Sequence, residues 1–372
     1  MAIRIVRHAE EHSAAVARFN QRLRAGGEAA QFPVSPVPSW LPPAPGRTIY
    51  QEHFLAVDQD GAVRGAYTLK HQDFQIGGDV VSIADLELPI SEGAVNRAYA
   101  SLAAMLLLDA QRKKPLIYGL GMGGRETTVA RLFAAAGWMM LVVPFFFKVV
   151  HPLAFLRKLP MLRSSPAKRL ILDVAAFSGL GWLGVKTIQW ARSRRVAGRA
   201  ALSVEQVDEF GPWADKLWAA CGGDYGMIAV RNAEVLRILY PKEDARFLRL
   251  RICDAGEPIG WSVVLDTKMT GHKQFGSLRV GSFVDGLARA ADAAKVVALS
   301  TAYLRQRGVD LIVSNQSHAA WRAAFDAAGY LRGPSNFVFT ACKDLAKRLE
   351  SSGVPGDEIY INRGDGDGPI HL

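Results

Sequence analysis

Two stretches of the chain share one pattern of apolar and polar positions. Residues 115–138 place a short apolar run before a glycine-rich turn, after which apolar side chains recur at helical spacing. Residues 309–330 repeat this order with a polar turn. Both helices end as Phe, three residues, Gly and an aromatic residue, from Phe133 to Trp138 and from Phe325 to Tyr330, and glycine ends helices because it adopts positive φ. The pattern predicts a strand–turn–helix unit that occurs twice.

The remaining periodicity predicts an α/β chain of mixed sheets. Residues 3–150 read as strand, helix, three strands, helix, strand, helix and two strands. In the second half we predict helices over residues 203–220, 231–240 and 291–307, and strands over 247–253, 259–268, 277–285 and 336–342. A proline-rich loop, residues 31–46, carries Trp40 and is predicted as either a lid that contacts substrate or a surface excursion.

Composition shifts divide the chain. The predicted parts are an N-terminal domain (1–150), a basic and apolar helical linker (151–200), a C-terminal domain (201–345) and a Gly/Asp-rich tail (346–372), which is expected to be loose from residue 353. Within the tail, residues 359–361 could add an edge strand.

The net charge of +10 is concentrated in the middle segment, where Lys148 to Arg199 contains eleven Lys or Arg and one acid, Asp173. The apolar run inside it, residues 170–185, is shorter than the roughly 20 residues of a membrane span. Residues 157–195 are therefore predicted either to lie on the surface of an anionic membrane or to form a helix that packs between the two domains.

The bulk composition is that of a folded protein, with 49% apolar and 22% charged residues. Three widely spaced cysteines (Cys221, Cys253 and Cys342) predict a reduced compartment without disulfides or a metal site. The N-terminus shows no secretory signal, so we expect a cytoplasmic protein, in contact with the inner membrane face if the basic segment binds lipid. Outside that segment the charge is near neutral, which argues against nucleic-acid binding.

The first repeated unit contains the sequence G-x-G-x-x-G between a strand and a helix, as in dinucleotide-binding proteins. No acidic residue follows about twenty positions later to hold a ribose, since the next acid after Glu126 is Asp173. Two other interpretations are close packing of strand and helix, and an anion-holding turn at a helix N-terminus. The candidate cofactor-binding residues here are Gly119, Gly121, Gly123 and Gly124.

The doubled order of elements resembles the GNAT acyltransferase fold, in the tandem form of the FemAB-like acyl and aminoacyl transferases. The second half carries the pattern of an Asn after the fifth strand and a helix that ends in Gly-aromatic: Asn315, Trp321, Phe325, Gly329 and Tyr330. The sequence RGDGDG at residues 363–368 also looks like the ends of FemAB-like chains. The resemblance implies two GNAT-like mixed-sheet domains in tandem and an acyl-CoA cofactor, with Asn315 and Arg289 as candidate cofactor-binding residues.

The sequence departs from this family at the turn that binds pyrophosphate. The family pattern is [R/Q]-x-x-G-x-[G/A]; residues 91–97 lack it, and the second half keeps only Arg289-x-x-Asp292-x-Ala294. A carboxylate at Asp292 would repel a diphosphate. One half is therefore a candidate for a purely structural role.

Candidate catalytic groups lie on the two predicted fourth strands. Acyl transfer to an amine needs a base and a donor for the carbonyl oxygen. Asp85 and Glu87 lie two apart, so they share a face and raise one another's pKa; Asp285 is the candidate base of the second half. Tyr330 is the candidate acid. The alternatives are that the carboxylates form an ordinary polar face or pair with Arg64 or Arg97, and that Tyr330 is a core residue.

Three functions remain open from the sequence. The first is N-acyl or aminoacyl transfer to an amine of a small molecule or of a cell-envelope or polysaccharide precursor, from acyl-CoA or aminoacyl-tRNA. The second is a degenerate tandem fold that binds a membrane surface or assists assembly. The third is a nucleotide-dependent oxidoreductase.

Overall fold

The computed structural model describes residues 3–121, 123–158 and 201–366. The chain forms two compact units, and neither is continuous in sequence. Unit 1 consists of Met1–Val142 and Asn336–Val354, and unit 2 of Val143–Ser335 and Pro355–Leu372. Each unit contains one mixed sheet, which confirms the predicted tandem of two mixed-sheet domains.

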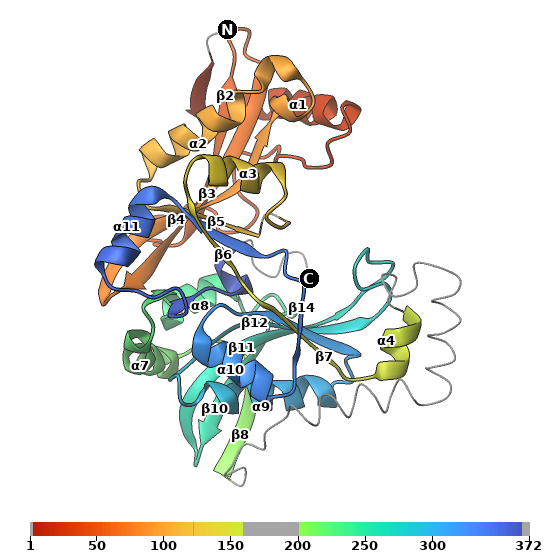
Figure 1. Cartoon of the computed structure of the whole chain (residues 1–372), viewed down its shortest axis with the longest axis vertical. Coiled ribbons are helices and arrows are strands. Elements are labelled where there is room, and N and C mark those ends of the chain that lie inside the picture. Colours follow the sequence, from red (N-terminus) through yellow and green to blue (C-terminus); the bar gives the residue numbers. More distant parts are fainter. Residues whose placement is uncertain (1–2, 122, 159–200, 367–372) are drawn as a thin grey trace. The chain divides into compact units, whose positions relative to one another are not determined.

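Unit 1 is built on the strand order β1-β2-β3-β4-β5-β15-β6. Its strands are β1 (Arg4–Arg7), β2 (Tyr50–Val57), β3 (Val63–Ile76), β4 (Asp79–Ser91), β5 (Ile117–Gly121), β6 (Met139–Val142) and β15 (Val338–Ala341). Its helices are η1 (Glu10–His12), α1 (Ser13–Ala25), η2 (Glu92–Ala94), η3 (Arg97–Tyr99), α2 (Leu102–Lys113), α3 (Thr128–Ala135) and α11 (Lys343–Ser351). The blue helix α11 therefore belongs with the red-to-yellow elements of this unit (Figure 1).

The helices α1 and α2 cover opposite faces of the unit 1 sheet. Ala66 packs in the core cluster under α1, together with Phe19 and Leu55. The next residue, Tyr67, points the other way and donates to Asp109 of α2. Successive residues of a strand face opposite sides, so every second residue of β3, counted from Ala66, lies on the face that carries α1.

Unit 2 follows the same plan with the order β14-β7-β13-β12-β11-β10-β8. Its strands are β7 (Phe145–Val149), β8 (Leu202–Val207), β9 (Met227–Ala229), β10 (Leu248–Asp254), β11 (Glu257–Lys268), β12 (Arg279–Ala288), β13 (Leu311–Asn315), β14 (Leu331–Gly333) and β16 (Ile359–Tyr360), which pairs with β9. Its helices are α4 (Pro152–Lys158), α7 (Pro212–Cys221), η6 (Gly222–Asp224), α8 (Ala233–Leu239), α9 (Ala293–Gln306), α10 (Ala319–Ala327) and η7 (Arg363–Asp365). Here α7 and α9 pack on β11 and β12.

The two units exchange one strand each, which corrects the predicted boundaries at residues 150 and 345. β7 follows β6 in the chain but pairs with β13 and β14, whereas β15 pairs with β5 and β6. Only Val143 and Pro144 separate β6 from β7. A two-residue hairpin needs positive φ, which Val-Pro cannot supply, and a residue before proline prefers extended backbone. The chain therefore runs on into the second sheet.

The duplicated helix ends are confirmed in detail. Gly137 has φ 74° and Gly329 has φ 77°. The amide of Trp138 donates to the carbonyl of Phe133 at 3.0 Å, and that of Tyr330 to the carbonyl of Phe325 at 3.1 Å. These are the hydrogen bonds of a Schellman motif.

Two predicted elements are wrong. Residues 203–220 form β8 and then α7, not one helix, because β8 pairs along its length with β10. The tail from residue 353 is not loose where it is described: Ile359, Tyr360 and Ile361 are buried, and β16 confirms the additional strand predicted there. The predicted helical linker lies outside the described residues, apart from α4.

Candidate functional site

In unit 1 the parallel strands β4 and β5 pair only briefly and then part. The paired residues are Ala84 with Ile117 and Asp85 with Tyr118. Beyond them β5 keeps only β15, which pairs along its other edge from Tyr118 to Gly121, while β4 continues beside β3 to Ser91. The register of β4 shifts just past Glu87, where Leu88 has a φ of 48°. Such a bulge takes backbone groups out of the ladder, and here it lies at the opening between the two strands.

A grid of polar side chains lies next to this opening, on the face of the sheet that carries α1. One row consists of His8, which directly follows β1, and of His53, Thr68 and Glu87 on β2, β3 and β4. The neighbouring row consists of Gln51, Lys70, Asp85 and Tyr118. Polar groups on the inner face of a sheet are costly unless they have partners, so this grid is the candidate site of unit 1.

The structure brings the predicted pair Asp85 and Glu87 together within this grid. Asp85 is buried at the point where the strands part, and Glu87 is partly exposed, two residues farther into the opening. Gln51 donates from Nε2 to Oε2 of Glu87 at 2.5 Å. Lys70 lies opposite Asp85 in the ladder and is 0% exposed. One exposed carboxylate beside a buried cation and a buried carboxylate is an arrangement suited to proton transfer.

The proline-rich loop is anchored to the same face. Phe32 and Leu41 are buried, and the ring of Trp40 lies under Nζ of Lys70, with 5.4 Å between the nitrogen and the ring centroid. Phe32 also packs edge-on against His53. The loop therefore contributes an aromatic side chain to the site in unit 1.

In unit 2 the corresponding strands part in the same way but the chain fills the opening. β12 and β13 pair from Val280 to Phe283 and then separate. Asn362, which precedes η7, forms a bridge to Gln316, just beyond the end of β13. Its Nδ2 donates at 2.7 Å to Asp285 on β12. The segment 359–365 therefore connects the two edges of the opening.

A buried ion network holds this segment in place. Arg231 is 1% exposed and contacts Asp285 at 3.0 Å and Asp365 at 2.8 Å. Tyr240 donates to the second oxygen of Asp285 at 2.9 Å. The predicted base of the second half is thus enclosed between Arg231, Tyr240 and Asn362, and this geometry favours a structural role for Asp285.

The predicted cofactor residues fall in two places. In unit 1, Gly119 lies within β5, where an added Cβ would come within 2.9 Å of Phe133, so its role is close packing of β5 and α3. Gly121, Gly123 and Gly124 turn with positive φ into α3, whose first turn is capped by Thr127.

In unit 2, Asn315 is buried and accepts from Arg363 of the tail at 3.0 Å. Arg289 is exposed at the start of the turn before α9. The amide of Ala290 in that turn donates to the carboxylate of Asp224 at 3.3 Å, and Asp292 follows. Two carboxylates therefore lie where a diphosphate would need free amides.

The amides of the equivalent turn of unit 1 are also in use. That of Gly93 donates to Oγ of Ser91 at 3.0 Å, and those of Val95 and Asn96 donate to the carbonyl of Glu92 at 3.0 and 2.8 Å. Neither turn has the free glycine-rich backbone of the family pattern, in agreement with the departure seen in the sequence.

Tyr330, the predicted acid, lies in the core of unit 2. Its hydroxyl is 2.9 Å from Oγ1 of Thr301, and its ring packs edge-on against Phe325. Burial raises the pKa of Tyr330 above its ordinary value. This surrounding is that of a core aromatic residue.

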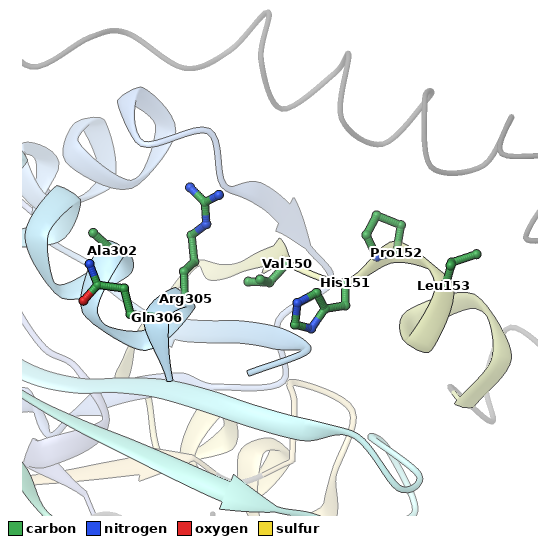
Figure 2. Close-up of a pocket in the computed structure, with 7 residues that line it drawn as sticks. All are labelled: Val150, His151, Pro152, Leu153, Ala302, Arg305 and Gln306. Carbon is green, nitrogen blue, oxygen red and sulfur yellow. The ribbon is translucent and has the colours of Figure 1, made fainter. Parts of the chain in front are cut away.

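A separate hollow in unit 2 lies between the start of α4 and the end of α9 (Figure 2). It is lined by Val150, His151, Pro152, Leu153, Ala302, Arg305 and Gln306. None of these lining residues is a carboxylate, and the hollow contains none of the predicted site residues.

The sequence analysis missed the buried row of His8, His53 and Thr68. A signal existed, because β3 contains Thr68, Lys70 and Gln72 at every second position, so that three polar side chains share one face.

Among the described residues no group of His, Cys, Asp or Glu could hold a metal ion, and no helix there could span a membrane.

Comparisons with known proteins support the fold. No protein-family model and no curated protein matches the chain. Solved structures do match. A probable N-acyltransferase from Enterococcus faecalis has a TM-score of 0.52 at 8% identity, over 94% of this chain and 74% of that one. A GCN5-related N-acetyltransferase from Anabaena variabilis has a TM-score of 0.51 at 11% identity, over 91% and 72%.

A third similar structure is the N-myristoyltransferase of Saccharomyces cerevisiae with bound myristoyl-CoA and inhibitors. Its TM-score is 0.52 at 8% identity, over 96% of this chain and 86% of that one. At such identities the similarity establishes the GNAT fold of the chain, and its chemistry has to be inferred from the residues of the site.

Proposed function

We propose that the chain is an N-acyltransferase in which unit 1 carries the reaction and unit 2 is a structural half. The observation that carries the proposal is the contrast between the two openings. In unit 1, Glu87 and Asp85 face the point where β4 and β5 part. In unit 2, residues of the chain itself cross the equivalent opening.

In this mechanism Glu87 is the base that takes the proton from the attacking amine. It is the more exposed of the two carboxylates and is oriented by Gln51. As the amine attacks the acyl carbon, negative charge develops on the carbonyl oxygen, and the amide of Leu88 at the bulge is the proposed donor to it, since Pro89 has no N–H. The buried cation of Lys70 adds a favourable field for that charge.

The finer assignment is a FemAB-like enzyme that acts on an amine of a cell-envelope or polysaccharide precursor. Two features support it. One is the sequence RGDGDG in the tail, and the other is Asn315, which follows the family pattern and accepts a hydrogen bond from Arg363 of that sequence. The acyl donor is an acyl-CoA or an aminoacyl-tRNA. In both units amides of the turn at the pyrophosphate position already donate within the chain, which favours a donor that is held by other contacts.

The experiment that tests this function offers acetyl-CoA, myristoyl-CoA and a charged aminoacyl-tRNA to the full chain with glucosamine as the amine probe. We expect donor consumption, followed as thiol or tRNA release, that depends on the amine. The proposal is wrong if none of the donors binds, as measured by thermal shift, and none is consumed.

A second proposal concerns the membrane and rests on the sequence of the basic segment. Neutralising Arg192, Arg194 and Arg195 is expected to abolish sedimentation with vesicles that contain phosphatidylserine, because each basic residue near such a surface contributes about 1 kcal/mol. Equal sedimentation of the wild type and this variant would exclude the segment as a membrane contact. Sedimentation without any donor turnover would instead favour a degenerate fold that acts as a membrane-surface assembly factor.

A further inference from the structure

The row that ends at Glu87 continues through buried groups to the other edge of the sheet. Nδ1 of His53 is 2.8 Å from Oγ1 of Thr68, which lies opposite Glu87 in the ladder. Opposite residues of an antiparallel pair have Cβ atoms about 4.5–5.5 Å apart. The ring centroid of His53 is 6.3 Å from that of His8, and the ring of His8 is 6.2 Å from that of His12.

The two inner imidazoles have capacity for hydrogen bonds that no described residue meets. His8 is 5% exposed and His53 is 4% exposed. Within the described part of the chain, neither ring nitrogen of His8 and not Nε2 of His53 has a hydrogen-bond partner. Buried polar atoms of this kind are commonly satisfied by ordered water, and one water can bridge two rings at this separation.

Both rings are uncharged at neutral pH. Burial, and then the neighbouring His8, lowers the pKa of His53 to about 4. Burial, and then His12, lowers the pKa of His8 to about 4. A neutral imidazole has one donor and one acceptor nitrogen, so it can take a proton on one side and release one on the other.

We propose that Thr68, His53 and His8 form a proton relay that carries the proton collected by Glu87 away from the opening. The relay rests on the proposed role of Glu87. It ends at His8, just past the edge strand β1, where water takes the proton. All three are positioning residues, because they act through Glu87.

The proton count balances in a single pass. Glu87 receives one proton from the amine and passes it through a water to the hydroxyl oxygen of Thr68, while the hydroxyl proton of Thr68 moves to Nδ1 of His53. The proton on Nε2 of His53 leaves through the bridging water to His8 and then to solvent. Each group ends with the number of protons it had at the start, and no electrons are transferred. His53 and His8 end as the opposite tautomer, which proton exchange with water restores before the next turnover.

The test compares two substitutions of one buried hydroxyl. Thr68→Val removes the hydroxyl at nearly constant shape and is expected to lower kcat at least about tenfold, at unchanged KM and with an altered solvent deuterium isotope effect. Thr68→Ser keeps the hydroxyl and is expected to retain turnover. Thr301→Val, which removes a buried hydroxyl of unit 2, is the matched control.

Several outcomes would overturn the relay. Full activity of Thr68→Val is one, and an equal loss in Thr68→Ser is another, since that loss would reflect packing. If Glu87→Gln is inactive while Thr68→Val is normal, the relay fails and the proposed function stands. If Glu87→Gln is fully active, the proposed base is wrong.

A second measurement needs no substrate. In ¹⁵N-labelled full chain at pH 7, we expect His53 to be neutral with its proton on Nε2, because Nδ1 accepts from Thr68, and we expect Thr68→Val to shift this tautomer. A charged His53, or a tautomer that Thr68→Val leaves unchanged, would also overturn the relay.

Discussion

Replacement of Glu87 by Gln is expected to lower kcat by about 10²–10⁴-fold, the usual contribution of a general base. The amide keeps the size of the side chain and can still accept the hydrogen bond from Gln51, but it cannot take a proton from the amine. Substrate binding should change little, so the loss should appear in kcat and not in KM. Single-turnover measurement of donor consumption, at saturating amine, reports this directly.

The matched control for that experiment is Glu205→Gln on the edge strand β8. The Glu205 side chain is 56% exposed and pairs with Arg251, so the same chemical change there should leave kcat within about twofold, because exposed ion pairs contribute little. If Glu87→Gln and Glu205→Gln have the same activity, the site in unit 1 is not the catalytic one.

Replacement of Arg231 by Met is expected to lower the free energy of unfolding by about 3–5 kcal/mol, because it leaves two buried carboxylates without their cation. Those carboxylates belong to Asp285 on β12 and Asp365 in η7, and all three side chains are 1% exposed. Urea unfolding followed by the fluorescence of Trp261 and Trp321, both buried in unit 2, measures the change. The loss should also release residues 359–365 to protease.

Arg246→Met provides the comparison for this experiment. Arg246 pairs with Asp244 on the surface, with half of its side chain exposed, so its replacement should cost under about 1 kcal/mol. Equal unfolding midpoints for the two variants would show that the network does not hold the tail in the opening of unit 2.

The sequence predicted most accurately those features of the fold that depend on residues close together in the chain. The two strand–turn–helix units and their Phe–Gly–aromatic ends are fixed by contacts within about five residues, as the hydrogen bonds of Trp138 and Tyr330 show. The alternation in β4 correctly placed Asp85 and Glu87 on one face, because side chains two apart in a strand point together. Val143-Pro144 also indicates the strand exchange, because this dipeptide cannot form a two-residue hairpin between β6 and β7. The predicted boundaries did not use that signal.

The prediction failed where a distant partner decides the structure. Residues 202–207 are a strand because β10 offers its edge, and local propensity at such positions is easily overridden. The tail is ordered because Arg231 and Asp285, far away in sequence, pair with it.

By itself, then, the sequence determined the elements, their duplication and the two carboxylates on β4. Only the tertiary structure decided which residues meet across strands: the row from His8 to Glu87, and Asn362 between the parted strands of unit 2. The physical reason is register. Periodicity along a chain specifies which face a side chain occupies, but its neighbours on that face depend on how whole strands align, and that alignment is set by packing of the complete sheet.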